Sequence, residues 1–232
     1  MKYKTLPFRI LIIFLILFPL LDLTDLTTHF YAYLTGNIIT EIITKQWHIA
    51  IISIVIFLAF LIPLSFRRKA NWVEYGLVSA FFVSLFVEMY GIPLTIIFAS
   101  KYFYTTDIIM PNIVQFSALG VNFGMDFAMV YGLILILIGM ALIGLGWITL
   151  YRNVKKQGLV TNGIYSYSRH PQYLGFILVI LGWFVGWPTI LTLIFSPILI
   201  YKYVSVCRKE EKEVSKKFSE YKKYKENVPF FV

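Results

Sequence analysis

The chain has 232 residues, of which 59% are hydrophobic and only 14% charged, and its mean hydropathy is +0.75. Soluble proteins carry about a quarter charged residues, so this composition predicts an integral membrane protein without a separate soluble catalytic domain. The net charge of +9 does not indicate nucleic-acid binding, because the basic residues flank apolar segments instead of interleaving with aromatic ones. The single cysteine, Cys207, excludes an internal disulfide.

Apolar stretches, taken in chain order, predict a fold with about six transmembrane helices. They lie near residues 8–23, 47–66, 72–99, 127–151, 173–186 and 188–206, and most approach the roughly 20 residues that span a bilayer. The last two form a hairpin that turns at Gly186-Trp187-Pro188, where proline stops helix propagation. The expected fold is therefore an all-α polytopic membrane protein.

The charged residues from Cys207 to Asn227 predict an amphipathic tail helix after the hairpin. We divide the chain into N-terminal scaffold helices, residues 1–126, and a functional core, residues 127–232, that holds the hairpin and the tail helix.

The lysines and arginines predict the orientation of these crossings. Of the 21 basic residues, all but Lys45 and Lys101 fall on one side of the predicted topology, and the positive-inside rule makes that side cytoplasmic. Both termini are then cytoplasmic in a multi-pass protein of the cell membrane. The loop at residues 152–172 and the tail also lie on this side, so His170 and Glu210 can meet.

One polar motif interrupts the apolar core. Arg169-His170-Pro171-Gln172-Tyr173-Leu174-Gly175 precedes the hairpin, and Glu210-Glu211 follows its histidine by forty residues. Ionisable groups near hydrocarbon need partners and usually mark function. The tail could anchor to anionic lipid or cover a cofactor pocket. Adjacent acids are a poor choice for anchoring a helix to anionic lipid, so we favour a tail that covers a pocket, although one helix can do both.

One superfamily is resembled by this motif, its lead-in from Gly158 to Ser168, the hairpin and the tail. The tail residues that carry the resemblance are Arg208-Lys209-Glu210-Glu211, Phe218, Tyr221, Tyr224 and Val228-Pro229. The superfamily comprises the isoprenylcysteine carboxyl methyltransferases and the phospholipid methyltransferases, and the resemblance covers roughly residues 150 to 230. It implies an S-adenosylmethionine-dependent membrane methyltransferase without a Rossmann domain, whose active site faces the cytoplasm. The implied acceptor is a lipid-like or prenylated amphiphile that enters from the bilayer.

The resemblance also implies the site residues. Those expected to bind the cofactor are Gln157, Gly158, Leu159, Val160, Tyr165, His170, Pro171, Gln172, Tyr173, Glu210 and Glu211. These assignments agree with the chemistry, because a sulfonium and an ammonium need carboxylates and the cofactor's own carboxylate suits Arg169. Arg208 lies two residues after the position of the family's acceptor-binding arginine. Arg169, for its fit to the cofactor's carboxylate, and Arg208, for its nearness to that position, are the candidate catalytic residues. We assign no metal, since His29 and His48, near a water interface, have no ligand-type residues at suitable spacing.

The tail departs from the family pattern at one point. The family's Phe-Gly-x-x-Tyr spacing is here Phe218-Ser219-Glu220-Tyr221, one residue shorter and without the glycine. One residue is a rotation of about 100° on a helix, so Tyr221 and Tyr224 are left out of the predicted site.

Two other classes of function compete with the methyltransferase. An NADPH-dependent membrane reductase of the sterol and steroid reductase type has a similar Arg-x-Pro-x-Tyr-x-Gly element, but usually with Asn and Glu where this chain has Gln172 and Phe176. A non-enzymatic transporter or assembly factor is disfavoured, because transport sites are expected near mid-membrane and the polar candidates here gather on one face.

Overall fold

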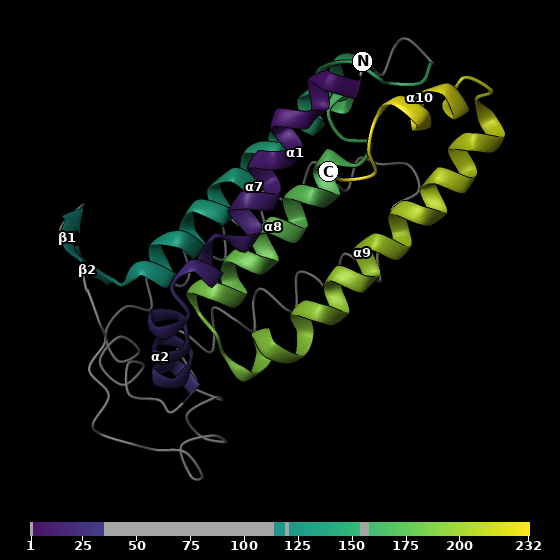
Figure 1. Cartoon of the computed structure of the whole chain (residues 1–232). Helices are drawn as coiled ribbons and strands as arrows, with labels where there is room; N and C mark the ends of the chain where they lie inside the picture. Colours follow the sequence, from purple (N-terminus) through teal and green to yellow (C-terminus); the bar gives the residue numbers. More distant parts are fainter. Residues whose placement is uncertain (1, 35–113, 119–120, 154–157) are drawn as a thin grey trace. The chain divides into compact units, whose positions relative to one another are not determined.

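The computed structural model describes residues 2–34, 114–118, 121–153 and 158–232, and most of them are helical (Figure 1). The elements in chain order are α1 (Lys2–Leu17), the 3-10 helix η1 (Phe18–Leu21), α2 (Leu23–Leu34), β1 (Val114–Ala118), β2 (Val121–Met125), α7 (Phe127–Asn153), the 3-10 helix η3 (Gly163–Ser166), α8 (Pro171–Gly186), α9 (Ile190–Lys217) and α10 (Tyr221–Asn227).

The all-α prediction is confirmed for most of the described residues, and the structure adds one small antiparallel sheet of β1 and β2. Val114 lies opposite Met125, and Ala118 lies opposite Val121. Val114 and Phe116 alternate with Gln115 and Ser117, which is the two-residue period of a strand. A prediction based on the length of apolar runs does not detect so short an alternation.

Among the described residues, α7 is the one single helix that is long and apolar enough to cross a membrane. The segments Thr5–Leu21 and Leu23–Leu34 pass the same test only as a bent pair, and α8 is apolar but shorter. The predicted crossings at 47–66 and 72–99 lie outside the described residues. A total of six crossings therefore stays a prediction.

The outer surfaces of α1 and α7 are apolar, as expected for helices in contact with lipid. Large exposed side chains include Leu11 and Phe14 on α1 and Leu137 and Leu145 on α7, each more than half exposed. In water such a surface would be unusual for a monomer.

The hairpin of α8 and α9 turns where the sequence predicts. Helix α8 ends at Gly186, and α9 begins at Ile190 after Pro188. Thr189 and Thr192 cap the start of α9 reciprocally, because the hydroxyl of each accepts a hydrogen bond from the backbone N–H of the other, at 2.7 and 3.2 Å. Such a capping pair satisfies backbone donors that the first turn leaves unpaired.

The tail from Cys207 to Asn227 is mostly helical, as predicted, but it does not form one helix that starts after the hairpin. Helix α9 continues without a break to Lys217, and a second short helix, α10, follows from Tyr221. The run from Cys207 to Lys217 contains neither glycine nor proline and is rich in lysine and glutamate, which favour helix continuation.

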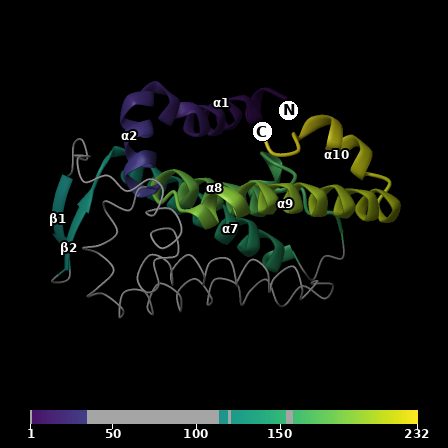
Figure 2. The same ribbon diagram turned by 90° about the horizontal axis from the view of Figure 1, so that it is seen from below.

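The chain divides into two compact units. The first contains residues Met1–Leu23, Val130–Trp183 and Ile198–Val232, and the second contains Thr24–Met129 and Phe184–Pro197. The predicted boundary after residue 126 stays a prediction. The polar motif, the carboxylate pair and both chain ends belong to the first unit, and the start of α1 and the C-terminus lie near α10 (Figures 1 and 2).

In the second unit, His29 is fully buried, which corrects the expectation that it lies near a water interface. Its Nδ1 lies 2.5 Å from Asp126 Oδ2, and Asp126 Oδ1 accepts a hydrogen bond from the Met129 N–H at 2.8 Å. Asp126 therefore caps α7 and pairs with α2 at the same time. The two partners are 97 positions apart in the sequence, which explains why local spacing did not reveal the pair.

Glycines let α7 and α8 approach each other closely in the first unit (Figure 2). A Cβ atom at Gly139 would lie 2.5 Å from the Gly175 carbonyl oxygen, and one at Gly175 would lie equally near the Gly139 oxygen. Gly182 meets the Gly132 carbonyl in the same way. Gly182 therefore serves close helix packing, and the contacts of Gly139, Gly175 and Gly182 hold α8 against α7.

We expect Gly175→Ala to lower the free energy of unfolding by about 1 to 3 kcal/mol, because the added methyl group would collide with the backbone of α7. Gly144→Ala is the matched control, since nothing lies within 4 Å of its Cβ position. Thermal unfolding of both variants in detergent measures the difference. Equal melting temperatures would contradict this account of the α7–α8 contact.

Candidate functional site

The loop before α8 is held against the last turns of α7. Gly163 has a φ of 59°, a left-handed conformation, and a Cβ atom there would lie 3.1 Å from Thr149 Oγ1. The Asn153 side-chain amide donates a hydrogen bond to Asn162 Oδ1 at 3.3 Å. Only glycine combines this backbone with this approach, so the Gly163 turn sets the course of the chain toward Arg169.

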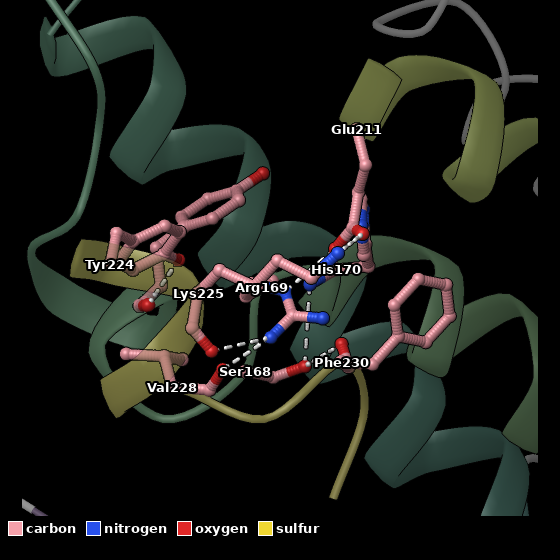
Figure 3. Close-up of polar contacts among 9 residues, drawn as sticks. Ser168, Arg169, His170, Glu211, Tyr224, Lys225, Val228 and Phe230 are labelled. Carbon is pink, nitrogen blue, oxygen red and sulfur yellow. Dashed lines mark hydrogen bonds and ion pairs between the residues drawn. The ribbon is translucent and has the colours of Figure 1, made fainter. Parts of the chain in front are cut away.

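Glu211 is the centre of an ionic cluster, which we define as Arg169, His170, Glu211, Tyr221 and Lys225. Figure 3 shows Arg169, His170, Glu211 and Lys225. Arg169 Nε donates to Glu211 Oε1 at 2.6 Å, and His170 Nε2 lies 3.3 Å from the same oxygen. Lys225 Nζ lies 3.4 Å from the other oxygen, and the Tyr221 hydroxyl also hydrogen-bonds the carboxylate. The side chains of Arg169 and Glu211 are only 8% and 10% exposed, so each depends on the other for compensation of its charge.

Arg169 also fastens the C-terminal strap, defined as Val228–Val232, to the motif (Figure 3). Its Nη1 donates to the carbonyl oxygens of Lys225 and Val228, at 3.0 and 2.6 Å, and its backbone N–H donates to Pro229 at 3.0 Å. The neighbouring Ser168 hydroxyl donates to the Phe230 carbonyl at 3.2 Å. The Arg169 guanidinium thus caps the end of α10 and pairs with Glu211 simultaneously.

Aromatic rings of the strap cover the histidine of the motif. The Phe230 ring centre lies 4.8 Å from that of His170, and Phe231 follows at 6.3 Å. The Arg169 guanidinium lies over the Phe230 ring at 5.6 Å. The strap therefore brings π-electron faces, which attract cations, beside the ionic cluster.

Glu210 takes part in a second contact between α8 and α9. The Tyr173 hydroxyl donates to Glu210 Oε1 at 2.6 Å. The Tyr173 ring lies 5.9 Å from Tyr203, which stacks on Phe176 at 5.1 Å. An aromatic column thus leads from the carboxylate pair toward the apolar part of the hairpin.

Burial and neighbouring charges set the pKa values of the cluster in opposite ways. Burial is the largest influence on His170 and lowers its pKa below the usual 6.5, although Glu210 and Glu211 act against this. Burial alone would raise the pKa of Glu211, but hydrogen bonds from Tyr221 and Arg169 and the nearby positive charge outweigh it and lower the pKa. At neutral pH the cluster therefore holds a neutral imidazole and an ionised carboxylate.

We expect the protein to lose stability as the pH falls below 6.5. A histidine whose pKa is lowered by folding binds a proton more readily in the unfolded chain, so acid favours unfolding from 6.5 down to the folded pKa. Glu211 adds a loss in the same direction below its ordinary value of 4.5. Chemical unfolding of His170→Gln should show a flatter dependence between pH 7 and 5 than the wild type, and an identical slope would contradict this prediction.

The structure brings several of the predicted site residues together. Arg169, His170, Tyr173, Glu210 and Glu211 lie around the contact of the motif with α9. Tyr165 is buried, and its carbonyl accepts a hydrogen bond from the Tyr224 hydroxyl at 2.6 Å. Pro171 and Gln172 begin α8, and both are buried.

The other predicted residues lie apart from this group. The Gln172 side chain faces Gly146 on α7 instead of the carboxylates. Gly158 is exposed, and Leu159 and Val160 are partly exposed in the preceding loop. Arg208 is exposed on α9, and no hydrogen bond or ion pair joins it to the ionic cluster in the described part of the chain. Gln157 lies outside the described residues.

Sequence reasoning missed the tail residues that complete the cluster. Tyr221 and Tyr224 were left out because of the shortened spacing, yet the first binds Glu211 and the second binds Tyr165. Lys225 and Phe230 were also missed. The break at Phe218, Ser219 and Glu220 separates α9 from α10. Because α10 is a new helix, the missing residue does not rotate Tyr221 and Tyr224 by about 100° as it would in one continuous helix.

Comparison with known proteins gives one match. Residues 124–216 match the sequence model of the isoprenylcysteine carboxyl methyltransferase (ICMT) family. No curated protein and no solved structure matched the chain. The matched segment contains the motif, the hairpin and the carboxylate pair, so the family resemblance is confirmed there.

Proposed function

Because residues 124–216 carry the sequence pattern of the isoprenylcysteine carboxyl methyltransferase family, a family of membrane methyltransferases, we propose that the protein is a membrane-embedded methyltransferase that uses S-adenosylmethionine. The acceptor in this proposal is a lipid-like or prenylated amphiphile. The observation that carries the proposal is the convergence of the motif, the carboxylate pair and the strap within one compact unit.

The chemistry of the cluster fits a cationic cofactor. S-adenosylmethionine, when bound, supplies a methyl group on a positively charged sulfur. Glu210 is held by Tyr173 and lies next to Glu211, so its carboxylate is well placed to bind the ammonium or compensate the sulfonium. The rings of Phe230 and His170 offer faces that suit the same charge.

The residues of this chain would act by orientation and by exclusion of water. Tyr173 and the strap fix the positions of Glu210 and of the ring of His170. Holding two reactants in line can lower a barrier by several kcal/mol without a strong base. In this proposal Arg169 is a positioning residue for the strap, and Glu210 contacts the cofactor.

The membrane supplies the acceptor in this proposal. A lipid-like chain loses about 0.8 kcal/mol of favourable burial per CH₂ when it passes through water, so entry from the bilayer is favoured. The aromatic column of Tyr173, Tyr203 and Phe176 leads from Glu210 toward the apolar part of the hairpin, and it offers a path of suitable chemistry.

Ligand titration tests the class of reaction. Full-length protein, purified in detergent, is titrated separately with S-adenosylmethionine and with NADPH in a calorimeter. We expect saturable binding of S-adenosylmethionine alone. Binding of NADPH alone would select the membrane reductase, and binding of neither would favour a non-enzymatic protein.

A further inference from the structure

Gln172 has a buried side-chain amide whose hydrogen-bonding capacity is unused in the part of the chain that the structure describes. The residue is 3% exposed, and neither its Oε1 nor its Nε2 has a hydrogen-bond partner. Leaving such a group unpaired is unfavourable, because the amide loses its hydrogen bonds to water on burial. A leucine would fit this apolar helix contact without an unpaired polar group, so the amide calls for a polar partner that the described residues do not supply.

Gly146 makes the space that this amide occupies. A Cβ atom at Gly146 would lie 2.5 Å from Gln172 Cγ and 3.6 Å from its Nε2. The amide therefore rests on the bare backbone of α7. By contrast, Gly144 has nothing within 4 Å of its Cβ position.

Gln172 of α8 contacts the same face of α7 that the loop before the motif contacts. Residues 146, 149 and 153 are spaced by three and four and so share one face of a helix. Gly146 meets Gln172, Thr149 meets Gly163, and Asn153 meets Asn162. The amide thus lies beneath the loop that leads to the buried Tyr165.

The start of α8 therefore has two different polar sides. His170 and Tyr173 face the carboxylates of α9, where positive charge is favoured. Gln172 faces α7, where an uncharged group with both a donor and an acceptor is required. In S-adenosylmethionine the sulfonium and ammonium fit the first description and adenine fits the second, because its amino group and the adjacent ring nitrogen match an amide in the bidentate manner known for glutamine.

We propose that Gln172 recognises the adenine base of the cofactor and so determines specificity for an adenosyl group. Its Oε1 accepts a hydrogen bond from the exocyclic amino group, and its Nε2 donates one to the neighbouring ring nitrogen. This inference rests on the proposed function and gives Gln172, which the family resemblance places among the cofactor-binding residues, a specific role toward the base.

The test compares two ligands by calorimetry on the full-length protein. One is S-adenosylhomocysteine, and the other is its analogue in which unsubstituted purine, without the amino group, replaces adenine. A site built around a hydrogen bond rejects a ligand that lacks it, so we expect the wild type to bind the adenine ligand about 10-fold more tightly. In Gln172→Leu the ratio of the two affinities should fall to near one. A variant that had only lost structure would bind both ligands more weakly and would keep the ratio.

Two glycine variants provide a second route to the same answer. Gly146→Ala would push Gln172 out of place and should reduce the ratio, whereas Gly144→Ala should leave it unchanged. This pair decides the matter if Gln172→Leu does not fold. A wild-type ratio near one, or a ratio that survives both Gln172→Leu and Gly146→Ala, would overturn the inference and leave an amide that binds only water. If the wild type binds neither ligand, the proposed function fails as well.

Discussion

Replacing Arg169 by glutamine is expected to lower the free energy of unfolding by about 3 to 5 kcal/mol, because it leaves the buried Glu211 without its main counter-charge. The same change removes the donor to the carbonyl oxygens of Lys225 and Val228. The C-terminal strap should then detach more readily from the motif. Thermal unfolding and limited proteolysis of the C-terminus in detergent measure the two effects.

Arg169→Lys separates the charge from the geometry. Lysine keeps the positive charge but cannot donate to Glu211 and to two carbonyl groups from one planar group. We expect this variant to unfold at a temperature between those of the wild type and Arg169→Gln, with a strap that proteases still cut readily. A strap protected as in the wild type in both variants would show that Arg169 does not hold it.

The second large effect is expected at Glu210. Glu210→Gln should weaken S-adenosylmethionine binding by about 10- to 150-fold, since loss of a charged hydrogen-bond partner costs roughly 1.5 to 3 kcal/mol. Tyr173 can still donate to the amide oxygen, so the contact between α8 and α9 should survive. Calorimetry measures the affinity, and the melting temperature of the unliganded protein checks the fold.

Glu220→Gln is the matched control for this prediction. Glu220 is exposed and precedes α10, where its side chain makes no capping hydrogen bond. The same change of charge at this position should leave the affinity close to that of the wild type. Equal losses in the two variants would assign the effect to net charge instead of to a contact with the cofactor.

The helices nearest the site could be predicted because their signals are local. Continuous apolar runs marked α7, α8 and the first part of α9, and Gly186 and Pro188 marked the turn between α8 and α9. The approach of the motif to the carboxylate pair followed from their expected location on one side of the membrane. Their roles toward a cofactor stay predictions.

The strap could not be predicted, because its acceptors are backbone carbonyl groups. Every residue has such a group, so no pattern of side chains predicts that Arg169 donates hydrogen bonds to the carbonyl groups of Lys225 and Val228. The position of Tyr221 depended on a break between α9 and α10 that shifts the phase of the helix. The direction of Gln172 depended on Gly146, 26 residues earlier in the chain, leaving space on a different helix.

Transfer of a labelled methyl group tests the central proposal most directly. Purified wild-type protein is incubated with S-adenosylmethionine carrying tritium in its methyl group and with a lipid extract of membranes, and the organic phase is counted. The account predicts radioactivity in the lipid phase that increases with time and falls at least about 10-fold in Glu210→Gln at limiting cofactor. No transfer above that of heat-inactivated protein, or equal transfer by wild type and Glu210→Gln, would contradict it.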